Sequence, residues 1–222
     1  MSDGYTVDDV FSHNSLDVFP RGSSVLISGP AHIGKRSILL SILARAEWAA
    51  EKSLLVITRG NIHEYVQEYA TLAKGRGTES LSVIDASLGQ NPEAVELLAP
   101  EQIVTVGTPT NLTGIGIKIA EYFQHTSADV SGIRIGFDQI TTLLRYLGPE
   151  QVSRFIDVLI GRFSAAGYLS VFTIDSDAHD PQIVSLVGYE FDVHIELRRK
   201  GDQQREYRVG GIPEIPENWN IL

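Results

Sequence analysis

The chain of 222 residues contains no cysteine, which excludes disulfide bonds and thiolate metal sites. It has no apolar run near the about 18 residues that a membrane-spanning helix needs. Its first residues, MSDGYTVDDVFSHN, are polar and acidic and lack the apolar core of a signal peptide. We therefore expect a cytoplasmic protein that does not insert into membranes.

Lysine is also scarce, with five residues beside thirteen arginines, and 28 acidic residues bring the net charge to −10. Such a surface argues against tight nonspecific binding of nucleic acid. Aromatic residues do not alternate with a basic stripe, so nucleic acid is an unlikely partner. The composition suits a high-salt cytoplasm, where ions screen the repulsion, and an ordinary acidic cytosolic protein equally well.

No repeat, low-complexity tract or linker divides the chain, so we expect one domain over residues 1–222. Residues 1–15 would form an N-terminal extension, and residues 192–222 a C-terminal hairpin and tail. Short apolar runs predict buried strands at Ser24–Ser28, Ser53–Thr58, Leu81–Asp85, Ile103–Gly107, Ile133–Asp138 and Leu169–Asp175. Helical spacing predicts helices at Lys35–Glu51, Ile62–Lys74, Leu112–His125 and Pro149–Ala165.

This alternation of strands and helices predicts an α/β fold with a mostly parallel central sheet and helices on both faces. The end of the chain differs. Asp192–Arg199 and Arg205–Val209 flank a short turn at residues 200–202, which predicts a β-hairpin that adds antiparallel strands at one edge.

One segment carries a recognisable chemical motif, a P-loop of the form glycine, four free positions, Gly-Lys, then Ser or Thr. It follows an apolar strand and opens a helix, the arrangement that aims backbone N–H groups at a phosphate. We expect nucleotide binding by its nine residues, which are Gly29, Pro30, Ala31, His32, Ile33, Gly34, Lys35, Arg36 and Ser37.

Arg36 stands where this motif has the hydroxyl that holds Mg²⁺, and a guanidinium cannot ligate a metal. Ser37 lies one position further on, about 100° around the helix, and would substitute only if the loop shifts. The alternative is that the loop is a structural relic, with Lys35 solvated or paired to a carboxylate.

Asp138 ends the apolar run Ile133–Asp138, where P-loop proteins carry an acid that fixes Mg²⁺ through water. An Asp after a strand is often only a helix cap. Together with the loop, it is our candidate for the metal-binding acid.

These segments resemble the RecA/RadA superfamily, in its KaiC-like branch. The strand and loop at residues 20–30, Asn111–Ile117, the Asp138 segment and the run from Phe172 to Asp180 are similar to small KaiC-like proteins common in haloarchaea. The resemblance covers about residues 16–212 and implies a RecA-like core that binds ATP or ADP with Mg²⁺. It also implies that Lys35 contacts phosphate, that Asp138 serves Mg²⁺, and that copies or other proteins assemble with the chain.

The chain departs from this family at the residues that would cleave ATP. Arg36 makes the Walker A motif degenerate, and the second strand runs into Arg59-Gly60-Asn61 where the family has its catalytic glutamates. The nearest glutamate, Glu64, falls on the next helix, and in-line attack needs a base beside the water. We predict a nucleotide-binding regulator that is at most a weak ATPase. A scaffold without nucleotide and an ATPase with a rearranged site are the alternatives.

Two further groups stand out. Asp175, Asp177, His179 and Asp180 follow a buried strand in no recognised metal spacing, so we expect loop capping, with Asp175 a possible switch residue by resemblance. Arg59, Arg134 and Arg145 are candidates to act across a subunit boundary, although surface salt bridges are the commoner role.

Overall fold

The computed structural model describes residues 4–8, 10–11, 16–88, 95–126, 130–201, 204–213 and 215–222. Its strands are β1 (Gly4–Thr6), β2 (Val18–Pro20), β3 (Ser24–Gly29), β4 (Glu51–Ile57), β5 (Leu81–Asp85), β6 (Ile103–Thr105), β7 (Gly132–Asp138), β8 (Leu169–Asp175), β9 (Val193–Lys200), β10 (Gln204–Gly210) and β11 (Asn220–Ile221). Its α-helices are α1 (Lys35–Ala44), α2 (Ile62–Leu72), α3 (Leu112–His125), α4 (Ile140–Tyr146), α5 (Pro149–Ala165) and α6 (Pro181–Gly188).

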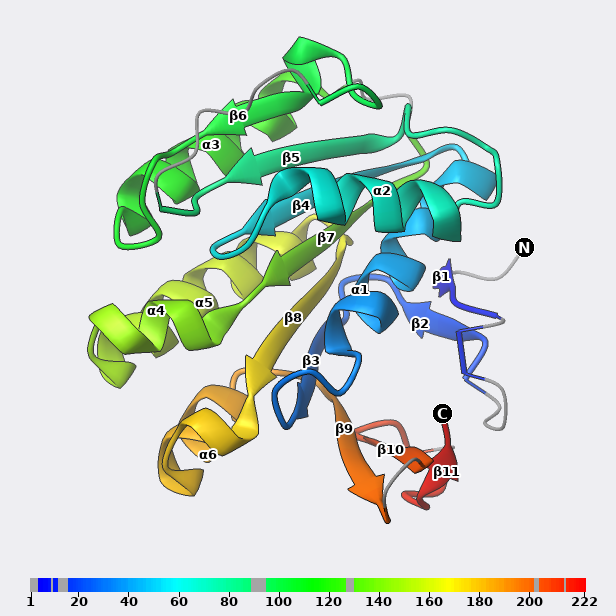
Figure 1. Cartoon of the computed structure of the whole chain (residues 1–222), viewed down its shortest axis with the longest axis vertical. Coiled ribbons are helices and arrows are strands. Elements are labelled where there is room, and N and C mark those ends of the chain that lie inside the picture. Colours follow the sequence, from blue (N-terminus) through cyan, green and yellow to red (C-terminus); the bar gives the residue numbers. More distant parts are fainter. Residues whose placement is uncertain are drawn as a thin grey trace.

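A nine-stranded sheet forms the centre of the molecule, in the order β11-β10-β9-β3-β8-β7-β4-β5-β6 (Figure 1). The strands from β9 to β6 in this order are parallel, and β10 and β11 are antiparallel at one edge. The predicted α/β fold with a mostly parallel sheet is therefore confirmed. The turn at Gly201 has φ 64°, and the predicted turn residue Asp202 lies outside the described residues.

Alternation along each strand divides the apolar side chains between two cores, one on each face of the sheet. On β4, Leu55 and Ile57 face the core beneath α1 and α2, while Leu54 and Val56 face the core beneath α3, α4, α5 and α6. The parallel strands are buried on both faces, which explains why they read as continuous apolar runs.

Some predicted boundaries were wrong. The helix expected to reach Glu51 ends at Ala44, and a 3₁₀ turn covers Arg45–Trp48 before β4 begins at Glu51. The alanines there favour a helix, but pairing of Glu51 with Gly132 in the sheet overrides this propensity. The hairpin strand β9 joins β3 in parallel, so only β10 and β11 add antiparallel strands. The short helices α4 and α6 and the β1–β2 pair were not predicted.

Arg134 of β7 ties the N-terminal strands to the sheet. Its guanidinium lies 2.5 Å from Oε2 of Glu51 and donates to the carbonyls of Thr6 and Ile42. The side chain is 1% exposed and lies near the ring of Tyr5. This excludes Arg134 as a residue that acts across a subunit boundary.

Replacing Arg134 with Ala should destabilise the protein by about 3–5 kcal/mol, because Glu51 would keep a buried charge without its partner. Urea denaturation measures this loss, with the same substitution at exposed Arg154 as the control. A cost below about 1 kcal/mol would contradict the assigned role of the ion pair.

Candidate functional site

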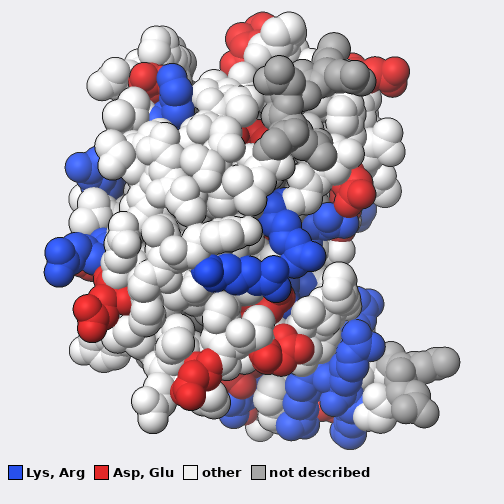
Figure 2. Space-filling model, turned by 60° about the vertical axis from the view of Figure 1, so that its left-hand side comes forward, with Lys and Arg blue, Asp and Glu red and all other residues white. Residues whose placement is uncertain are grey.

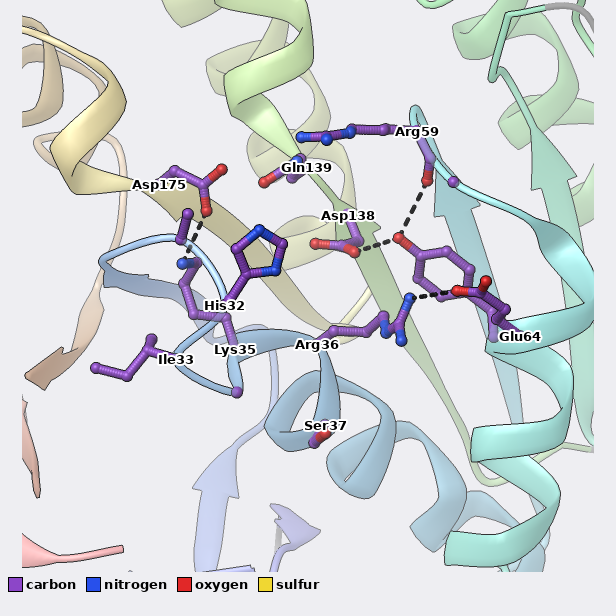
Figure 3. A pocket seen from close by; sticks show the side chains of 14 residues that line it. His32, Ile33, Lys35, Arg36, Ser37, Arg59, Glu64, Asp138, Gln139 and Asp175 are labelled. Atoms are coloured by element: carbon purple, nitrogen blue, oxygen red, sulfur yellow. Dashed lines mark hydrogen bonds and ion pairs between the residues drawn. The ribbon is translucent and has the colours of Figure 1, made fainter. Parts of the chain in front are cut away.

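A pocket of about 480 Å³ opens at the carboxyl ends of β3, β4, β7 and β8 (Figure 3). Open α/β sheets commonly bind ligands at this edge. The structure brings the predicted loop, Asp138 and Asp175 together there. The lining residues are Ala31, His32, Ile33, Gly34, Lys35, Arg36, Ser37, Arg59, Gly60, Glu64, Tyr65, Asp138, Gln139 and Asp175.

Residues 29–34, which we call the glycine loop, lead from β3 into α1. Gly34 adopts φ 109° at the start of the helix, and a Cβ there would lie 2.7 Å from the guanidinium of Arg205. Arg205 also donates to the carbonyl of Ile33 over 3.3 Å, so β10 supports the loop from outside. Among the described residues, no side chain caps the first N–H groups of α1.

Lys35 is buried beneath the glycine loop with every N–H donor engaged. Its Nζ lies 2.9 Å from the carbonyl of Gly29, 2.5 Å from that of Pro30 and 2.8 Å from Oδ1 of Asp175. The backbone N–H of Ala31 donates to Asp177 over 3.1 Å. The carboxylates of Asp175 and Asp177 therefore contact Lys35 and the N–H of Ala31, two groups that the sequence predicts to bind phosphate.

Arg36 and Ser37 turn toward α2. The guanidinium of Arg36 pairs with Glu68 at 2.9 Å and Glu64 at 3.4 Å, and lies 4.8 Å from the ring centre of Tyr65. The Ser37 hydroxyl donates to Glu68. Glu64 lies on α2, as predicted, and its carboxylate faces a cation (Figure 3).

Asp138 lies at the end of β7 with both carboxylate oxygens engaged. The Tyr65 hydroxyl donates to Oδ2 over 2.5 Å, and the Thr173 hydroxyl donates to Oδ1. Burial raises the pKa of the Asp138 carboxyl, against the lowering by the two hydroxyls and by Arg36. Burial and the Asp138 charge also raise the pKa of Tyr65, so Tyr65 stays a donor.

These residues do not fit a Mg²⁺ site. Mg²⁺ requires near-octahedral oxygen ligands, usually one or two carboxylates with water. Both oxygens of Asp138 accept from hydroxyls, Ser37 is bound to Glu68, and the cation of Arg36 acts on Asp138. No group of three or more His, Cys, Asp or Glu in the described part of the chain is arranged to hold a metal.

The model of a family of unknown function, DUF7504, matches residues 22–197, which include the whole pocket lining. The chain belongs to this family. No curated protein matches it. Among solved structures, it is similar to the KaiC-like protein PH0186 of Pyrococcus horikoshii OT3, with a TM-score of 0.64 and 12% identity, over 100% of this chain and 92% of that one. The likeness shows a KaiC-like RecA fold.

In this DUF7504 chain, sequence reasoning missed Tyr65 and Thr173. Alternation along β8 puts Thr173 on the same face as Asp175, so counting back two residues would have found it. The role of Tyr65 has no such signal, because the packing of α2 decides it. The loop-capping expectation is confirmed for Asp180, which accepts from the N–H of Gln182 at the start of α6.

Charge is distributed unevenly over the DUF7504 chain. On the side that carries α3, α4 and α6, lysines and arginines gather at the centre and lower right of the view (Figure 2). The pocket lining holds three cations, Lys35, Arg36 and Arg59, and three carboxylates. Its charge is thus balanced, although the whole chain carries −10.

None of the described helices is long and apolar enough to span a bilayer.

Replacing Asp138 with Asn should change the pH dependence of stability. Because the folded pKa of Asp138 is raised, its contribution to stability is present below about pH 4, the unfolded pKa, and is lost as pH rises through the folded pKa. The stability of Asp138→Asn relative to wild type should therefore increase from about pH 4 upward and then level off.

Urea denaturation of both proteins across this pH range measures the difference. The same substitution at exposed Asp157 is the control. A relative stability that falls as pH rises would show that the hydroxyl contacts outweigh the burial of Asp138.

Proposed function

We propose that this protein is a nucleotide-binding regulator of the KaiC-like type, which holds ATP or ADP in the pocket and hydrolyses it weakly or not at all. The observation that carries the proposal is the position of the glycine loop. It lies at the carboxyl edge of a parallel sheet, opens a helix whose first N–H groups are capped by no side chain of the described residues, and borders a pocket of about 480 Å³. That volume is within the usual range for small-molecule sites.

Two cations are placed to contact a nucleotide. When a nucleotide binds, Nζ of Lys35 would leave the carboxylate of Asp175 and contact an outer phosphate, because both groups present anionic oxygen atoms. Arg59 is exposed, forms no ion pair among the described residues, and extends across the pocket above Gln139 (Figure 3). Arg59 is therefore positioned to contact a ligand at the opening of the pocket. Asp175, moved by this exchange, would be the switch residue.

Weak hydrolysis follows from the carboxylates near the pocket. β4 ends at Ile57, and the next side chain, Thr58, donates to the carbonyl of Gln139 over 2.8 Å. Glu64 is paired with Arg36, and Asp138 and Asp175 are engaged as well, so among the described residues no carboxylate of the lining is free to act as the base for water. This argues against the rearranged ATPase. Assembly with copies of itself or with protein partners is part of the proposal by analogy with KaiC-like proteins.

A scaffold without nucleotide is the second candidate, favoured by one specific observation. The groups of the glycine loop already have internal partners, since Lys35 binds Asp175 and Ala31 binds Asp177. Under this alternative, the two carboxylates are permanent parts of the loop.

Titration with fluorescent ATP in high-salt buffer distinguishes the two. We expect saturable binding that is abolished in Lys35→Ala and kept in Lys118→Ala, which removes the same charge on α3. No binding at micromolar ATP would reject the proposal in favour of the scaffold.

Asp175→Asn provides a sharper test. Removing the competing carboxylate should strengthen ATP binding about fivefold or more, since one unit charge about 4 Å away contributes about 1 kcal/mol in a water-like dielectric and more at a buried site. If Asp175 is only structural, the substitution will lower the stability of the protein without strengthening binding. The change in ATP affinity separates these outcomes, because stability falls in both when Lys35 loses its buried partner. Phosphate release near background is expected in every variant.

A further inference from the structure

We propose that the guanidinium of Arg36 replaces the divalent cation, so that the ligand of this pocket is a metal-free nucleotide. This inference rests on the proposed function and specifies the form of its ligand. It assigns to Arg36 the specificity for free polyphosphate over its magnesium complex.

The position of Arg36 supports this assignment. It follows Lys35 in the first turn of α1 and lines the same pocket. Its charge acts on Asp138, the strand-end acid that the sequence analysis assigned to the metal. The site thus already holds a positive charge near the acid and next in sequence to Lys35 (Figure 3).

A metal ion would meet three obstacles here. It would compete with the hydroxyls of Tyr65 and Thr173 for the carboxylate oxygens of Asp138. It would find the Ser37 hydroxyl engaged by Glu68. It would also be repelled by the positive charge of Arg36, which acts on the same acid.

The guanidinium has donors left for phosphate. Arg carries five N–H donors in a planar fork that matches phosphate oxygens in pairs. Glu68 contacts Nε and Glu64 contacts Nη1 over 3.4 Å. The Arg36 side chain is 39% exposed, so these pairs are weak and rearrange readily. A phosphate would therefore gain charge-assisted hydrogen bonds without dismantling the site.

Calorimetric titration of wild-type protein with ATP, once in EDTA and once in excess Mg²⁺, tests the inference. We expect clear binding in EDTA and an affinity that Mg²⁺ lowers, because Mg²⁺ neutralises the charge that Arg36 recognises. Arg36→Thr should weaken binding in EDTA by about tenfold or more, the loss of one charge-assisted hydrogen bond. Arg154→Thr, which removes the same charge on α5 outside the pocket lining, should have no effect.

Each other outcome overturns the inference in a recognisable way. Binding that Mg²⁺ leaves unchanged or strengthens would reject the role of Arg36 and leave the proposed function standing. Unchanged binding of Arg36→Thr in EDTA would do the same. Absence of binding in both buffers would reject the proposed function and this inference together. The wild-type comparison remains decisive if Arg36→Thr fails to fold.

Discussion

A buried ammonium group must be surrounded by oxygen atoms, and Lys35 imposes this requirement on the carboxyl edge of the sheet. Its three donors draw in two loop carbonyls and Asp175, which holds the loop closely over the end of β8. Asp177, two residues beyond Asp175, then reaches the N–H of Ala31. The conformation of the glycine loop therefore depends on the Lys35 cation and on the carboxylates of Asp175 and Asp177.

The sequence alone predicted the scaffold that makes this arrangement possible. Parallel strands bring their carboxyl ends to one edge, so a loop after β3 and an acid after β7 had to lie close together. Alternation predicts the face as well. Arg134, Gly136 and Asp138 share one face of β7, and Gly136 lets α1 approach, since a Cβ there would lie 2.7 Å from Leu43. Local pattern determines these features, so they were predictable.

The partners of each charge were not predictable, because they depend on how separate elements pack. Nothing in the sequence around Arg36 indicates that α2 will present Glu64 and Glu68 to it, or that Tyr65 will reach Asp138. The end of α1 is a similar case, since sheet pairing at Glu51 overrides a run of helix-forming residues. Tertiary contacts decided the site chemistry, whereas periodicity decided the fold.

This distinction changes how the pocket should be understood energetically. Lys35, Arg36 and the N–H of Ala31 already have internal oxygen partners, so phosphate binding at these groups is an exchange of one oxygen ligand for another. The free energy of binding is a small difference between large terms, so adding or removing one carboxylate changes the affinity measurably. The buried pair of Lys35 and Asp175 resists exchange more than the exposed pairs of Arg36 do, because less water screens it. A phosphate would therefore exchange with the pairs of Arg36 more readily than with the pair of Lys35 and Asp175.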